Sequence, residues 1–150
     1  MKSDSGTYLL ILRSNSKATI EVGKLGKILL KRGYYIYVGS AFGQGGLRAR
    51  VSRHFRKDKP THWHIDYLSK FLTPVAVWYT YHQKPLEHKW AKFLSNMRTI
   101  TPIPGFGCSD CSCQSHLFYY PKKPDLVFLS KQISSKVQIW VKRFTDYPVE

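Results

Sequence analysis

The chain has 150 residues, enough to bury a hydrophobic core in one domain without disulfide staples. It carries 24 lysine and arginine residues against nine aspartate and glutamate residues, which gives a formal net charge of +15. Such an excess of positive charge favours binding to a polyanion, because binding releases counterions, so nucleic acid is the leading class of partner. The alternative is that the charge only aids solubility. The apolar run Leu9–Leu12 is too short for a signal peptide or a membrane span. We therefore expect a cytoplasmic protein with no membrane contact.

The first part of the chain predicts short strands joined by turns. The apolar segment Thr7–Leu12 predicts a buried strand, and residues 18–22 predict a second, shorter one. A turn, a strand and another turn over residues 23–33 lead to the tyrosine-rich segment Tyr34–Val38. We expect this segment to be the last strand of an antiparallel meander, followed by a glycine-rich loop over residues 41–46.

The segment after this loop predicts a helix. Leu47, Val51 and Phe55 recur every four positions and form one apolar stripe. Arg50 and His54 flank that stripe, so Arg50 is placed to reach across the strand surface from which the tyrosines emerge. The other basic side chains are expected on a solvated face that contacts nucleic acid: Arg48, Arg53, Arg56 and Lys57.

The second half of the chain alternates predicted helices and strands. A helix is expected at His64–Leu72, a strand at Pro74–His82, and a helix from Pro85 that carries Glu87 at the edge of its apolar stripe. A breaker-rich loop follows at residues 101–107, and residues 136–144 form an amphipathic segment. The pattern predicts an α/β fold of the α+β type, with a small, mainly antiparallel sheet flanked by helices. We expect a single domain over residues 1–150.

All three cysteines fall within six positions, close to a histidine. These residues are candidate zinc ligands: Cys108, Cys111, Cys113 and His116. An odd number at this spacing fits a metal site or free thiols better than a disulfide framework. The alternative is a tight loop with small buried thiols and a hydrogen-bonded histidine.

Two short motifs and three later residues resemble the GIY-YIG nuclease superfamily. The motifs are Gly6-Thr7-Tyr8 and Tyr37-Val38-Gly39, and Arg50, His54 and Glu87 follow in the order typical of that superfamily. The resemblance implies that tyrosines and an arginine surround a scissile phosphodiester while a glutamate holds Mg²⁺ or Mn²⁺. It assigns catalytic roles to Tyr8, Tyr37, Arg50 and His54, and metal binding to Glu87.

Longer segments are similar to one branch of that superfamily, which is sometimes fused to endonuclease III-like DNA glycosylases. They are YVGSA, RHFR, HWHIDYL and GFGCSDCSCQSHLFYY. This resemblance covers about residues 6–120, which makes residues 121–150 a basic C-terminal extension. It implies a DNA glycosylase as a partner, and DNA rather than RNA as the substrate.

Three functions compete on these patterns. The first is a metal-dependent endonuclease that acts on nucleic acid in repair or processing. The second is a catalytically inactive nucleic-acid-binding module of the same fold, because no clear counterpart of the superfamily's asparagine follows Glu87. The third is a zinc-stabilised interaction adaptor. A purely structural interpretation also stands, in which Tyr8 and Tyr37 pack in a sheet and Glu87 favours a helix N-terminus.

Overall fold

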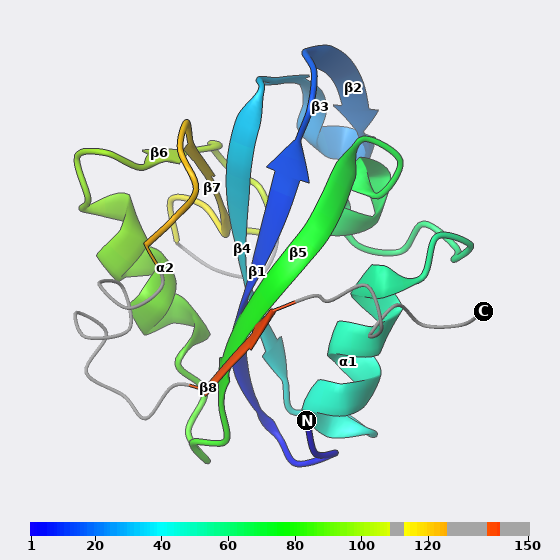
Figure 1. The fold of residues 1–150 in the computed structure, drawn as a ribbon, viewed down its shortest axis with the longest axis vertical. Coiled ribbons are helices and arrows are strands. Elements are labelled where there is room, and N and C mark those ends of the chain that lie inside the picture. The colour runs from blue at the N-terminus through cyan, green and yellow to red at the C-terminus, as the bar shows by residue number, and fades with distance from the viewer. Residues whose placement is uncertain (109–112, 126–137, 142–150) are drawn as a thin grey trace.

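The computed structural model describes residues 1–108, 113–125 and 138–141, the last four by their backbone (Figure 1). Six strands form one sheet in the order β6-β7-β4-β1-β5-β8, and all neighbours pair antiparallel. The strands are β1 (Gly6–Ser14), β4 (Gly33–Ala41), β5 (Leu72–Thr80), β6 (Thr101–Pro102), β7 (Leu117–Tyr120) and β8 (Gln138–Val141). The predicted α+β class with a mainly antiparallel sheet is confirmed.

Strand β1 lies in the middle of the sheet because its side chains are apolar on both faces. Leu9 and Ile11 point to one face, and Tyr8 and Leu10 point to the other. Each face is covered by one helix, and Figure 1 shows the two helices on opposite sides of the sheet. Helix α1 (Gly46–Phe55) covers the Tyr8 face, and helix α2 (Glu87–Ser95) covers the Leu9 face. The alternation along β1 therefore decides which residues can meet near each helix.

The predicted meander is wrong, because β4 pairs with β1 and not with the strand before it. Strands β2 (Ala18–Val22) and β3 (Gly26–Leu30) form a separate hairpin, joined by the 3-10 turn η1 (Gly23–Leu25). Alternate residues of this hairpin are exposed, so it has only one face to bury. Strand β1 is buried almost throughout and needs a partner on each edge, which β4 and β5 provide.

The predicted helix at His64–Leu72 is also wrong in its length. Its first residues form the 3-10 turn η2 (His64–Leu68), and Leu72 already begins β5. The residue before Pro74 prefers an extended backbone, which favours the strand over a longer helix. Helix α2 begins at Glu87, two residues after the expected start.

The amphipathic segment at residues 136–144 contributes strand β8, and its other residues lie outside the described part of the chain. Among the described residues, no helix has both the length and the apolar character needed to cross a membrane.

Candidate active site

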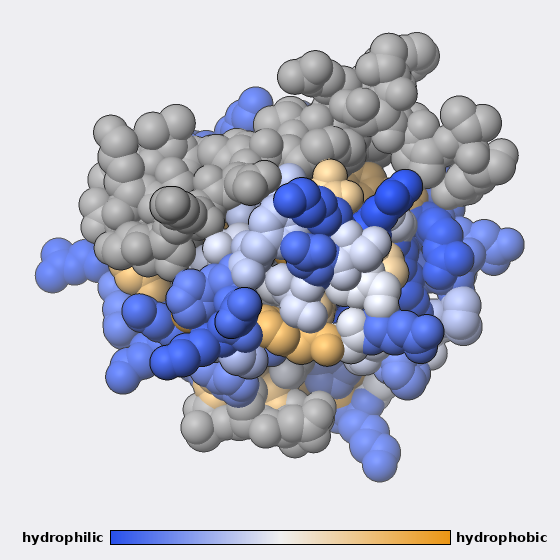
Figure 2. All heavy atoms as spheres, turned by 90° about the horizontal axis from the view of Figure 1, so that it is seen from below, coloured by the Kyte–Doolittle hydropathy of each residue, from blue (hydrophilic) through white to orange (hydrophobic). Residues whose placement is uncertain are grey.

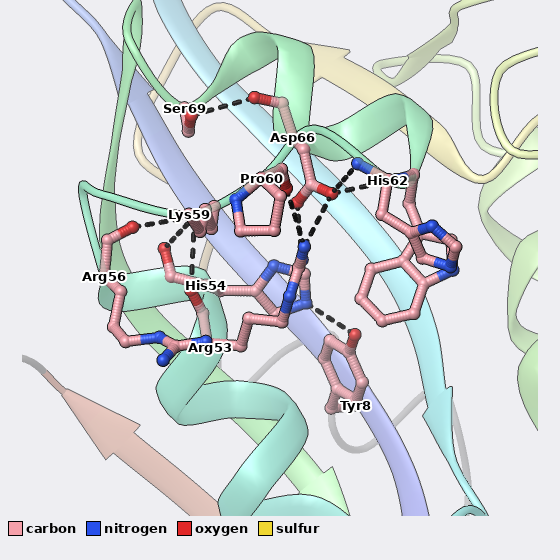
Figure 3. A network of polar contacts seen from close by, with 10 residues as sticks. Tyr8, Arg53, His54, Arg56, Lys59, Pro60, His62, Asp66 and Ser69 are labelled. Atoms are coloured by element: carbon pink, nitrogen blue, oxygen red, sulfur yellow. Dashed lines mark hydrogen bonds and ion pairs between the residues drawn. The ribbon is translucent and has the colours of Figure 1, made fainter.

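Tyr8, Tyr37 and His54 form one cluster between the sheet and α1. Tyr8 comes from β1 and Tyr37 from the neighbouring β4, and both lie on the face that α1 covers. The Tyr8 hydroxyl lies 2.6 Å from Nε2 of His54 (Figure 3). The Tyr37 ring centroid is 6.4 Å from that of Tyr8 and 5.8 Å from that of His54. Three side chains that the resemblance assigned to one site are therefore neighbours.

All three groups are neutral near pH 7, and burial strengthens this. Removal from water raises the pKa of Tyr8 well above its ordinary value, and the nearby Tyr37 adds to this. Burial raises the pKa of Tyr37 as well, and Glu87 contributes through its charge. For His54, burial and then the charge of Lys59 lower the pKa to about 3. The cluster is thus a hydrogen-bonded pair of neutral groups beside a second neutral tyrosine.

The glycines of the two motifs are required because neighbouring atoms lie too close to leave room for a side chain. A methyl group at Gly39 would overlap the Tyr8 ring, because Gly39 is the direct partner of Tyr8 across the β1–β4 pair. A methyl group at Gly6 would overlap the carbonyl oxygen of Thr80. The absent side chain at Gly39 gives the Tyr8 ring its place against the sheet, which links the motif to the position of a candidate catalytic group.

Arg50 lies beside this cluster and is held by an aromatic ring. Its guanidinium carbon is 4.3 Å from the centroid of Trp63, a cation–π contact. The charge of Arg50 offsets part of the rise in the pKa of Tyr8 and Tyr37, and it also disfavours protonation of His54. The arginine on the flank of α1 therefore acts electrostatically on all three members of the cluster.

Glu87 is the first residue of α2 and belongs to the opposite layer. Its Oε1 lies 3.3 Å from Nδ1 of His116, and it also hydrogen-bonds to Ser40. Burial raises the pKa of Glu87, but the bonds to His116 and Ser40 and the charge of His88 outweigh burial and hold it below its ordinary value. Glu87 is therefore ionised at neutral pH, and its charge raises the pKa of both Tyr8 and Tyr37.

A half-buried, ionised carboxylate suits a hard divalent cation. Mg²⁺ prefers oxygen ligands and keeps several waters, so one protein carboxylate is a sufficient anchor. Glu87 fits that requirement through its donor chemistry and its lowered pKa.

Residues 7–139 match the model of a family described as Domain of unknown function DUF123, which is a GIY-YIG-like family. The chain belongs to this family. The match includes every side chain of the candidate site, from Tyr8 to His116. No curated protein and no solved structure matches the chain. For this DUF123 chain, the GIY-YIG resemblance is confirmed at the level of the family.

Arg53 is not on the solvated face expected for it. Its guanidinium forms a two-bond ion pair with Asp66, at 2.7 and 3.0 Å, and also donates to the carbonyl of Pro60 (Figure 3). Asp66 accepts from the backbone N–H groups of His62 and Trp63, each at 2.8 Å. Burial raises the pKa of Asp66, but Arg53 and the two backbone bonds outweigh it and lower the pKa overall. The pair fixes the loop that carries Trp63.

The sequence patterns did not predict that Trp63 contacts both Arg50 and Arg53. Its ring lies against the guanidinium groups of both Arg50 and Arg53, at 4.3 and 4.4 Å from its centroid. In the sequence, Trp63 stands out only as part of the HWHIDYL segment that carries the family resemblance. A signal that could have been used is Asp66, placed three residues after it where it can accept from the backbone at residue 63.

The remaining basic residues of the predicted nucleic-acid surface are exposed. Arg48, Arg56 and Lys57 are open to solvent, and the last two line a pocket of about 570 Å³ that His54 also reaches. Lys59 instead donates to three carbonyl groups at the end of α1, as Figure 3 shows. Figure 2 shows hydrophilic side chains among smaller apolar patches on the described part of the face seen from below.

The predicted zinc ligands are divided by the structure. Cys113 and His116 come together, and the imidazole of His88 joins them, with all three ligand atoms within 4.8 Å of one another. Cys108 lies outside this group, and its thiol donates to the carbonyl of Phe106. Cys111 lies outside the described residues. His88 was missed, although its place beside Glu87 at the start of α2 could have singled it out.

Proposed function

We propose that this DUF123 domain is a metal-dependent endonuclease that hydrolyses phosphodiester bonds in nucleic acid. The observation that carries the proposal is the 2.6 Å contact between the Tyr8 hydroxyl and Nε2 of His54, beside Tyr37 and the charge of Arg50. DNA is the preferred substrate over RNA, in repair or processing, by the GIY-YIG resemblance.

In this proposal, Tyr8 and His54 move the proton of the attacking water. Tyr8 donates its hydroxyl proton to Nε2 of His54, and its oxygen accepts a hydrogen bond from the water. As the water oxygen bonds to phosphorus, the water proton moves to Tyr8 and the Tyr8 proton moves to His54. A bound phosphate is an opposite charge that raises the pKa of His54 and so favours this transfer. The bond from phosphorus to the leaving sugar oxygen breaks, and that oxygen takes a proton from solvent.

Arg50 supplies positive charge for the phosphate. Phosphodiester cleavage adds negative charge to the non-bridging oxygens, and a guanidinium that is already held in place stabilises that charge. Trp63 holds Arg50 by its ring, so the guanidinium is oriented before substrate binds. A divalent cation anchored by Glu87 would neutralise the same developing charge.

Binding of the polymer is assigned to the exposed basic side chains. A net charge of +15 and the exposed Arg48, Arg56 and Lys57 favour contact with several phosphates. Such contacts release counterions, so affinity is expected to fall steeply as salt rises.

The test is cleavage of labelled single-stranded, duplex, flap and branched DNA, and of RNA, at low salt with Mg²⁺ or Mn²⁺. We expect cleavage by the wild type and a loss of about 100-fold or more in Arg50→Ala and in Glu87→Ala. Arg98→Ala, an exposed arginine outside the side chains assigned to binding, is the matched control and should retain the rate. Full cleavage by both folded variants would remove this mechanism.

The second candidate is a catalytically inactive nucleic-acid-binding module. Asn96, which follows Glu87 in the sequence, lies at the opposite end of α2. Nine residues at 1.5 Å each place it about 13 Å along the helix axis, too far to share a cation with Glu87. Salt-sensitive binding without turnover on any substrate or with any divalent cation would favour this candidate.

A DNA glycosylase partner and a cytoplasmic location stay predictions.

A further inference from the structure

We propose a second metal centre, for a transition metal ion of the zinc class, formed by His88, Cys113 and His116. The three ligand atoms lie within 4.8 Å of one another, and Nδ1 of His88 is 3.0 Å from the Cys113 sulfur. This centre is separate from the carboxylate site at Glu87 and goes beyond the nuclease proposal. Its existence does not depend on whether the domain cleaves nucleic acid.

The donor atoms select the metal. Two imidazole nitrogens and a thiolate are typical zinc ligands, whereas Mg²⁺ prefers oxygen. Tetrahedral zinc, with bonds of about 2.0–2.3 Å, separates its ligand atoms by roughly 3.3–3.6 Å. The observed spacing spans this range, so binding requires side-chain movements of only about 1 Å. On binding, the Cys113 thiol releases its proton to solvent, and the sulfur and both imidazoles each donate one electron pair to the ion.

Two of the ligands stand on fixed parts of the fold. The backbone N–H of His116 donates to the Phe106 carbonyl, and its own carbonyl accepts from the Val38 N–H, both at 2.8 Å. His88 lies in the first turn of α2, where the Leu86 N–H donates to Oγ1 of Thr7 at 3.0 Å. An ion would therefore bind to positions that secondary structure already holds.

An ion can reach the cluster from solvent. His88 and Cys113 both line a pocket of about 430 Å³. His88 is exposed and His116 is buried, so the cluster extends from the surface inward. The three ligands found among the described residues leave one tetrahedral position for a further donor.

The centre also borders Glu87 through a contact typical of metal sites. Histidine ligands usually give their other ring proton to a carboxylate or carbonyl, which fixes the tautomer. Nδ1 of His116 lies 3.3 Å from Oε1 of Glu87 and 3.4 Å from the Val38 carbonyl. An imidazole that donates from Nδ1 carries its lone pair on Nε2, and that nitrogen can bind the ion. The metal centre would then hold the Glu87 carboxylate in a fixed orientation.

The test uses the metal-free full chain, titrated with Co²⁺ as a spectroscopic substitute for Zn²⁺, without nucleic acid. We expect one Co²⁺ per chain, tetrahedral visible bands and a thiolate charge-transfer absorption. Cys113→Ser should lose the charge-transfer absorption, and His88→Ala should weaken binding by about 100-fold or more. Cys108→Ser is the matched control, a half-buried cysteine outside the cluster, and should leave the spectrum unchanged.

Three results would overturn the proposal. They are no tetrahedral band in the wild type, an unchanged spectrum in His88→Ala, and loss of the thiolate absorption in Cys108→Ser. His88 is exposed, so its variant should remain folded and keeps the test decisive even if Cys113→Ser does not fold. Circular dichroism checks the fold of each variant. The titration contains no nucleic acid, so its failure and a failure of the cleavage test are separate results.

Discussion

The Tyr8 hydroxyl and Nε2 of His54 lie 2.6 Å apart, although 46 positions separate the two residues. Tyr8 is 1% exposed and His54 is 6% exposed, so both side chains are largely removed from bulk water. Burial and the nearby charge of Lys59 disfavour the protonated imidazole, so His54 is neutral in the folded chain. The same contact that supports the catalytic proposal therefore has consequences for stability, which can be measured without substrate.

Stability should fall as the pH drops below the ordinary pKa of histidine. The pKa of His54 is about 3 in the folded chain, against an ordinary value of 6.5. Between these values the unfolded chain binds a proton that the folded chain does not, so the stabilising contribution is present above pH 6.5 and is lost as the pH falls. From pH 7.5 to 5.5 we expect a loss of about 1.4 kcal/mol in the free energy of unfolding, measured by urea denaturation.

In His54→Gln, the loss in the free energy of unfolding that is due to His54 should disappear. His82→Gln, at an exposed position, should show the same pH dependence as the wild type. An identical slope in the wild type and in His54→Gln would contradict the buried neutral state of His54.

Gly39→Ala should displace Tyr8 and destabilise the fold. The added methyl group would overlap the Tyr8 ring, and overpacking of this kind costs about 1–3 kcal/mol. The free energy of unfolding of the variant gives the measurement. Gly43→Ala is the matched control, because a methyl group there meets no atom within 4 Å. Equal stabilities of the two variants would show that Gly39 is not required by close approach.

Asp66→Asn should destabilise the chain more than the loss of a surface charge would. The change removes the anionic partner of the mostly buried Arg53 guanidinium. We expect the free energy of unfolding to fall by about 3 kcal/mol at pH 7. The pKa of Asp66 is lowered, so its contribution is present above the ordinary value of 3.8 and is lost as the pH falls further. Thermal unfolding measures the effect, with Asp58→Asn, an exposed aspartate, as the control. Equal losses in the two variants would contradict a structural role for the ion pair.

Trp63→Leu should slow cleavage while the fold is retained. The cation–π contact with Arg50 is worth about 0.5–2 kcal/mol, so loss of the ring should lower the single-turnover rate by roughly 10-fold. The double variant Trp63→Leu/Arg50→Ala should be no slower than Arg50→Ala alone. If the two effects instead multiply, Trp63 does not act through Arg50.

Local patterns predicted the elements of the sheet better than they predicted their pairing. The apolar runs at β1 and β5 and the stripe on α1 are properties of short segments, and the structure has them where the patterns placed them. Pairing depends on which strand can bury both faces, and that requires comparison of segments far apart. The meander failed for this reason, since β1 takes β4 as a neighbour and excludes the β2–β3 hairpin.

The candidate site was predicted in part for the same reason. Tyr8, Tyr37 and His54 could be grouped because the family motifs preserve their order, and the structure brings them into contact. Nearby Asp66 and Glu87 could have singled out Trp63 and His88, but no local pattern indicates the residues that they contact. Each contacts a side chain from another element, Arg50 in one case and Cys113 in the other.

The central position of β1 makes assembly of the site inseparable from folding of the whole domain. Thr7 on β1 binds the start of α2 across 79 positions, and Val38 on β4 binds His116 across 78. A fragment that ended before residue 100 would lack β7 and would leave the edge of β4 open to pairing with other chains. We expect such a fragment to aggregate and not to form part of the site by itself. Any transfer of the candidate site to another protein must therefore move the complete sheet.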